Sequence, residues 1–137
     1  HIVRVCADNP LVSGEVIDEL IDFFIKHPCD YAYNQGDGGR TNDYPDGLGA
    51  EIVPFDLLMW IDAHGMEIRN REHCLTYITD NPHKFVIRTF NPPDQRLACP
   101  WLKLDMDTME DYRRLAMRKI TISSSPYEIV QAFSEDL

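Results

Sequence analysis

The sequence predicts an α/β fold with a mainly parallel sheet, because short apolar segments alternate with segments of helical periodicity along the 137 residues. The composition is that of a globular domain, with 44% hydrophobic and 26% charged residues. It has no low-complexity tract, and no internal repeat is visible. We therefore expect residues 1–137 to belong to a single domain.

Strands are expected where runs of apolar and β-branched residues are bounded by turn-forming residues. Five segments meet this description: 2–7, 31–34, 48–53, 84–90 and 101–106. A loop dense in Gly, Asn and Asp, residues 35–47, separates the second strand from the third and ends in the turn signature x-Pro-Asp-Gly.

Helices are expected after most of these strands. Ser13 is placed to cap a helix that runs to about residue 27, and Pro28 stops it. Pro54 suits the first turn of the next helix. Ser125 and Glu128 have the spacing of a capping box, with Pro between them at the first helical position. The remaining expected helices are 71–79, 108–119 and a last one from 126 to about 134.

Charge and composition exclude several functions. The net charge is −10, with 23 acidic against 13 basic residues, so a phosphate backbone would be repelled and nucleic-acid binding is not expected. The longest apolar runs are too short to span a membrane. The cysteines are scattered without a C-x-x-C pair, so we expect free thiols and a cytoplasmic location. The chain begins directly in a strand without Met, and we expect it to be part of a longer protein.

Acidic residues follow two of the expected strands. Asp8 ends the first strand, while Asp105 and Asp107 end another. Ligands of parallel sheets bind beyond the carboxyl ends of the strands, and paired carboxylates suit Mg²⁺. A local explanation is open as well: Asp107 and Glu110 have the spacing of an N-cap and its N3 partner, and Asp8 lies in a turn sequence.

Four motifs in order resemble one known family. They are VRVCADNPLVSGEVIDELIDFF, YPDGLGAEIVPFDLL, REHCLTYI and LDMDTMEDYRRL. The chain resembles the cytidylyltransferases of the spore-coat polysaccharide type, relatives of the CMP-KDO and acylneuraminate synthetases. The resemblance implies a Rossmann-like, GT-A-like nucleotidyltransferase sheet. It also implies transfer from CTP to a sugar or sugar acid with release of pyrophosphate.

The resemblance also implies the roles of individual residues. Asp8 and Asp107 match the family's catalytic magnesium ligands, with Asp105 as a neighbour. Position in the motifs assigns the sugar side of the site to Asp46, Gly47, Glu51, Arg71, Glu72 and His73. A tight turn at Asp46 and Gly47, and an ordinary helix start at residues 71–73, are the alternatives to this assignment.

The chain departs from the family pattern in two places. Met109 stands where the family usually has Pro, and Met also fits a first helical turn. The family's Gly-rich loop, whose Arg and Lys hold the triphosphate, has no counterpart here, and no other phosphate-binding motif replaces it. We therefore expect this C-terminal portion of a cytidylyltransferase domain to be inactive alone.

Other functions are open at this stage. GTP is an alternative to CTP, and a non-catalytic half-domain used for dimerisation or scaffolding is an alternative to an enzyme. Members of the resembled family are commonly dimers, so a homodimer is open as well.

Overall fold

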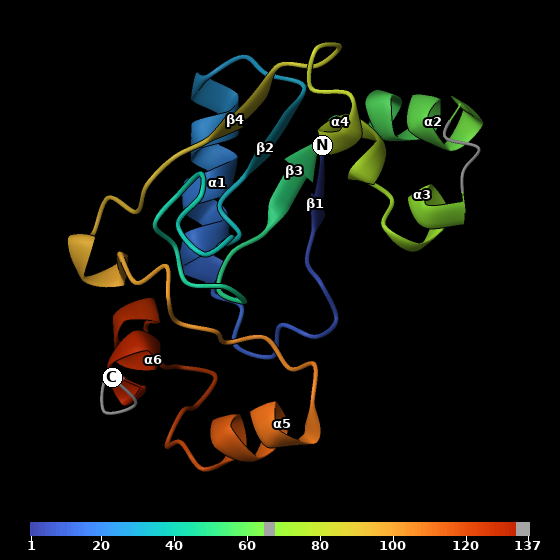
Figure 1. Ribbon diagram of the computed structural model, residues 1–137. Helices are drawn as coiled ribbons and strands as arrows, with labels where there is room; N and C mark the ends of the chain where they lie inside the picture. Colours follow the sequence, from blue (N-terminus) through green and yellow to red (C-terminus); the bar gives the residue numbers. More distant parts are fainter. Residues whose placement is uncertain (65–67, 134–137) are drawn as a thin grey trace.

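The computed structural model describes residues 1–64 and 68–133, and it confirms an α/β arrangement (Figure 1). Its sheet has four strands in the order β1-β3-β2-β4. The strands are three residues each: β1 Ile2–Arg4, β2 Tyr31–Tyr33, β3 Glu51–Val53 and β4 Ile87–Thr89. Each lies inside an expected strand, which was longer.

The expected mainly parallel sheet is wrong, because the sheet is mixed. β3 runs antiparallel to its neighbours β1 and β2, whereas the neighbours β2 and β4 are parallel, so β1, β2 and β4 share one direction and β3 opposes them. The reason lies in the connection between β2 and β3. Residues 35–50 form a loop without a helix, so the chain turns back beside β2 instead of crossing over the sheet, and such a return gives an antiparallel pair.

Helices cover both faces of this sheet. The helices are α1 Gly14–Lys26, α2 Phe55–His64, α3 Ile68–Glu72, α4 Thr76–Asp80, α5 Met109–Ala116 and α6 Pro126–Ala132. A 3₁₀ turn spans Gln95–Leu97. The single helix expected at 71–79 is thus divided into α3 and α4. In Figure 1, α2, α3 and α4 lie on one side of the molecule and α5 and α6 at its other end. No helix in the two described ranges has the length and apolar character needed to cross a membrane.

The alternation of side chains along the strands fixes which helix covers which face. Ala32 and Ile52 point to α1, where they pack with Leu20. Their neighbours Tyr31 and Val53 point to the opposite face, where they pack with residues of α2 and α4. The face that carries Tyr31 also carries the polar residues of the candidate site.

The segment expected as a strand at 101–106 is not one. It is extended and buries Leu102 and Leu104, but its ladder consists of one parallel bridge, between Lys103 and Asp46. This contact joins it to the turn after residue 45 and not to the sheet. The apolar alternation that predicted a strand reflects burial in a third core cluster, around Leu104, Tyr44 and Phe133.

The helix caps follow the sequence in two of three cases. Ser125 and Glu128 form the expected capping box of α6, with Pro126 at its start. Ser13 occupies the N-cap of α1, although its side chain makes no capping bond. The assignment of Asp107 as the cap of α5 is wrong. The cap is Thr108, whose hydroxyl accepts from the Asp111 N–H while the Asp111 carboxylate accepts from the Thr108 N–H.

Candidate functional site

Backbone hydrogen bonds join the segments that carry the predicted aspartates. The N–H of Met106 donates to the Asp8 carbonyl at 2.8 Å. The Asp46 N–H donates to Leu102 O at 3.0 Å, and the Asp46 carbonyl accepts from Leu104 N–H at 2.8 Å. We call Asp8, Asp46, Asp105 and Asp107 the acidic cluster. Its backbone is held by hydrogen bonds between segments that are far apart in the sequence.

Gly47 makes this approach possible. Its φ is +85°, a left-handed conformation that side chains disfavour. A Cβ at this position would lie 2.6 Å from the Asp105 nitrogen and 2.7 Å from the Leu104 carbonyl carbon. The tight-turn explanation of Gly47 therefore holds, and the turn brings Asp46 close to Asp105.

The carboxyl groups of Asp46 and Asp105 have shifted pKa values. Burial raises the pKa of Asp46, and the charge of Asp105 raises it further. Burial likewise raises the pKa of Asp105. In addition, Oδ1 of Asp105 and Oδ1 of Asp8 are buried without a hydrogen-bond partner. Unpartnered buried carboxylate oxygens are costly, and a cation would remove that cost.

Asp107 lies in a different environment. Its side chain is 57% exposed, against 13% for Asp105. Lys103 Nζ contacts Asp107 Oδ2 at 2.9 Å and Asp105 Oδ2 at 3.4 Å. The hydrogen bond from Lys103 holds the pKa of Asp107 below its ordinary value. The ammonium group of Lys103 thus compensates the charges of the acidic cluster.

A divalent ion at the acidic cluster would have few protein ligands. Within residues 1–64 and 68–133, no three or more His, Cys, Asp or Glu side chains are arranged to hold a metal. Mg²⁺ commonly takes only one or two carboxylates and completes its shell with water and phosphate oxygens. The unpartnered oxygens of Asp8 and Asp105 are hard donors of the kind this ion prefers.

A cavity of about 600 Å³ opens on the sheet face that carries Tyr31, and both polar and apolar side chains line it. Its wall includes residues from β1, β2, β3 and the region of α4: Arg4, Tyr31, Tyr33, Gln35, Gly36, Arg40, Glu51, His73, Thr76 and Thr79. We call it the sheet cavity. Gly36 connects it to the cluster, because a Cβ on Gly36 would lie 2.6 Å from the Asp46 nitrogen.

Glu51 forms the charged centre of the sheet cavity. It pairs with Arg4 across the antiparallel β1–β3 ladder and accepts a hydrogen bond from the Tyr31 hydroxyl. Burial raises the pKa of Tyr31, and the Glu51 carboxylate raises it further, so Tyr31 stays a donor. Glu51 therefore lines the sheet cavity. Its carboxylate oxygens already bind Arg4 and Tyr31, so its first role is to hold these two side chains.

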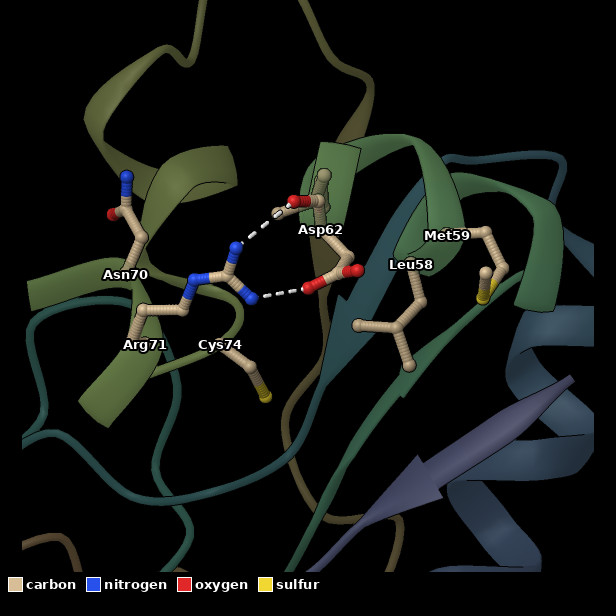
Figure 2. Close-up of a pocket in the computed structure, with 7 residues that line it drawn as sticks. Leu58, Met59, Asp62, Asn70, Arg71 and Cys74 are labelled. Carbon is tan, nitrogen blue, oxygen red and sulfur yellow. Dashed lines mark hydrogen bonds and ion pairs between the residues drawn. The ribbon is translucent and has the colours of Figure 1, made fainter. Parts of the chain in front are cut away.

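The three predicted residues at 71–73 separate in the structure. His73 is exposed and lines the sheet cavity. Arg71 points instead into a second cavity between α2 and α3, where it pairs with Asp62 (Figure 2). Glu72 is the last residue of α3, and its side chain lies outside the described residues. Arg71 thus does not share a cavity with Glu51 and His73.

Sequence reasoning missed Arg4, Lys103 and the orphaned oxygen of Asp105. Arg4 reads as an ordinary strand residue until the antiparallel pairing sets it opposite Glu51. Lys103 is two residues from Asp105 and four from Asp107. This spacing places the three side chains on one face only if the segment is extended, which the sequence alone does not establish.

Lys103→Gln is expected to lower the melting temperature of the magnesium-free chain. Lys103 Nζ also contacts Asp111 Oδ2 at 3.3 Å, so its removal leaves three carboxylates without a shared cation. Thermal melts at about 50 mM and 500 mM salt measure this, and the loss should be smaller at high salt because of screening. Lys26→Gln is the matched control, since Lys26 pairs with Asp22 on the exposed side of α1. Equal melting temperatures for the two variants would contradict the compensating role.

The candidate site therefore consists of the acidic cluster and the sheet cavity, whose wall includes hydroxyl and guanidinium groups.

Comparison with known proteins gives two relatives. The chain is 30% identical over 115 residues to the spore coat polysaccharide biosynthesis protein SpsF of Bacillus subtilis, covering 83% of this chain and 45% of that protein. It is 33% identical over 112 residues to the uncharacterized protein MJ1063 of Methanocaldococcus jannaschii, covering 82% of this chain and 43% of that protein. The chain thus spans less than half the length of these curated relatives. No family model matches it, and no solved structure matches it significantly.

Proposed function

We propose that a protein containing this chain transfers a cytidylyl group from CTP to a hydroxyl of a sugar or sugar acid, for polysaccharide synthesis. The observation that carries the proposal is the acidic cluster together with a cavity whose wall includes hydroxyl and guanidinium groups. The similarity to a protein named for spore coat polysaccharide biosynthesis supports the substrate class. The α/β sheet is compatible with a GT-A-like nucleotidyltransferase, and the free thiols of all four cysteines support a cytoplasmic location.

The residues of the chain divide the work of this reaction. In the transfer, a sugar oxygen forms a bond to the α-phosphorus of CTP, its proton is released, and the bond to pyrophosphate breaks. Bound Mg²⁺ would neutralise the charge on the phosphate oxygens. Asp8 would hold the ion together with Asp107, as the family pattern implies, or with Asp105, which the buried unpartnered oxygen favours.

The sheet cavity would hold the acceptor. Glu51 fixes Arg4 and Tyr31, so the remaining N–H donors of Arg4 are already oriented for hydroxyl or carboxylate oxygens, and the Tyr31 oxygen can still accept from a ligand hydroxyl. Tyr33 is held in turn by a hydrogen bond from its hydroxyl to Thr41 at 2.8 Å. Positioned donors lower the barrier of a phosphoryl transfer mainly by orientation, since little covalent chemistry is asked of the protein.

The test is pyrophosphate release by the complete protein. CTP, GTP, ATP and UTP are each supplied with Mg²⁺ and a panel of neutral sugars and 3-deoxy sugar acids. CTP with at least one acceptor is expected to give release at least about tenfold above every other nucleotide, and EDTA should remove it. Preference for GTP would replace the proposal by guanylyl transfer. No release with any pair, together with no magnesium-linked rise in melting temperature, would overturn it in favour of a scaffold.

A further inference from the structure

The N-terminus of α1 borders a cavity to which the proposed reaction assigns no role. The cavity has a volume of about 660 Å³. Its wall combines residues 10–15, which lead into the first turn of α1, with the loop 120–124 before α6 and with Ile129 of α6. We call it the α1 cavity. It thus joins segments that are more than a hundred residues apart in the sequence.

Ser13 is the N-cap of α1, but its hydroxyl does not act as an ordinary cap. Its N–H donates to the Leu48 carbonyl at 3.0 Å and its carbonyl accepts from the Ile17 N–H at 3.0 Å, so its backbone is fixed. Ser13 is only 7% exposed, its hydroxyl makes no capping bond, and no other hydrogen bond among the described residues involves that hydroxyl. A buried hydroxyl without a partner is costly. Because Ser13 lines the α1 cavity, a ligand there would supply the missing partner.

The first amides of α1 are available to the same ligand. The first N–H groups of a helix have no partner within the helix, and they form the positive end of its dipole. An N-cap side chain normally accepts from one of them, which the Ser13 hydroxyl does not do. Gly14, the first helical residue, has no side chain, and a Cβ there would meet nothing within 4 Å. A small anion can therefore approach the first turn.

The rest of the wall favours one class of anion. Thr121 and Ser124 add hydroxyl groups, and Leu11 and Ile129 add apolar surface. Within the described part of the chain this wall holds no Lys or Arg, and Glu15 contributes a carboxylate to it. A phosphate dianion would face that charge without a cation to compensate it. A single carboxylate carries less charge, and its hydrocarbon part can cover the apolar side of the wall.

We propose that the α1 cavity binds a small organic acid, with its one carboxylate at the first turn of α1 and its hydrocarbon part against Leu11 and Ile129. The Ser13 hydroxyl and the first amides of α1 donate to the carboxylate oxygens, as helix N-termini do for other anions. The inference does not depend on the proposed cytidylyl transfer, because none of these residues belongs to the acidic cluster or lines the sheet cavity.

Titration of the complete protein with hexanoate, followed by ligand-observed NMR, tests the site. Hexanoate is expected to bind with a dissociation constant of about 1 mM or below, which is ordinary for a ligand of this size. Acetate lacks the apolar part, hexan-1-ol lacks the charge, and inorganic phosphate carries more charge, so each should bind at least about tenfold more weakly. The proposal would be overturned by no hexanoate binding at about 10 mM, by tighter binding of phosphate, or by equal binding of hexan-1-ol.

Three substitutions locate the carboxylate. Ser13→Ala should raise the dissociation constant of hexanoate about tenfold, the effect of losing a hydrogen bond to a charged group. It should hardly change the melting temperature of the ligand-free protein, because the hydroxyl makes no capping bond. Gly14→Asp places a carboxylate in the first turn, which suits the helix dipole but repels the ligand, and should raise the dissociation constant at least about tenfold. Glu15→Gln should act in the opposite direction and tighten binding about threefold.

Ser125→Ala and Asp18→Asn are the matched controls. Ser125 makes the capping bond that Ser13 lacks, so its loss should lower the melting temperature and leave hexanoate binding within about twofold. Asp18→Asn removes an acidic charge from the exposed side of α1 outside the cavity, and binding should again stay within about twofold. Binding that survives both Ser13→Ala and Gly14→Asp would reject the α1 cavity. Asp18→Asn tightening binding as much as Glu15→Gln would mean a general effect of charge and would reject it as well.

Discussion

Asp8→Asn is expected to lower magnesium-dependent pyrophosphate release by the complete protein at least about a hundredfold, the effect of removing one group that stabilises transition-state charge. Asp8 lies in the segment after β1, and its carbonyl accepts from the Met106 N–H at 2.8 Å, so the position of its backbone does not depend on the carboxylate. The substitution removes a charge from a buried oxygen that has no partner. The variant should therefore fold while losing activity.

Asp105→Asn and Asp107→Asn distinguish the two candidates for the second carboxylate. The family pattern implies Asp107, which is exposed and already paired with Lys103. Burial and the orphaned Oδ1 point to Asp105. If Asp107 holds the ion, Asp107→Asn should remove most of the turnover; Lys103→Gln does not separate the two cases, because Lys103 contacts both carboxylates. If Asp105 holds the ion, Asp107→Asn should keep most of the turnover.

Asp18→Asn, on the exposed side of α1, is the matched control for these three substitutions. It removes the same charge away from the cluster and should leave turnover unchanged. Retention of turnover by all three cluster variants would reject the acidic cluster as the metal site. Loss of turnover together with a large fall in melting temperature would mean a structural effect, so each variant is melted without magnesium first.

The sequence predicted where the strands and helices lie better than it predicted which strands pair and in which direction. Each described strand lies within an apolar run, and Ser125 with Glu128 caps α6 as the spacing indicated. The direction of β3 was predicted wrongly. Residues 35–50 contain no helical pattern, and without a crossover helix the chain returns beside β2 as an antiparallel strand. A contact such as Arg4 with Glu51 depends on this register, which no local pattern encodes.

The candidate site was partly predictable for the same reason. Asp8, Asp46 and Asp107 were chosen as candidates from motifs, because turn residues and acids at strand ends are visible locally. The different environments of Asp105 and Asp107 were not, since burial depends on the turn at Gly47 packing against the 102–105 segment. Arg71 was grouped with His73 by neighbourhood in the chain, but the turn that separates α3 from α4 sends them to different cavities.

Gly47→Ala is expected to destabilise the chain by about 3 kcal/mol or more, a large part of a typical domain's stability. Two costs add. The left-handed φ of +85° costs about 1 kcal/mol for a residue with a Cβ. The Cβ would also lie 2.6 Å from the Asp105 nitrogen, and displacing backbone in a packed region costs about 1–3 kcal/mol. Urea unfolding measures the sum.

Two other glycines separate these costs. Gly38 has a φ of +75° but open space around its Cα, so Gly38→Ala should show the backbone cost alone, about 1 kcal/mol. Gly14 has open space and an ordinary φ at the start of α1, so Gly14→Ala should be neutral or slightly stabilising.

If Gly47→Ala costs no more than Gly38→Ala, the 102–105 segment moves freely. In that case the turn does not hold Asp46 against Asp105, and the acidic cluster is not preorganised. If it costs much more, the same glycine that closes the turn also sets the spacing of the carboxylates. The variant should then lose any magnesium-linked rise in melting temperature.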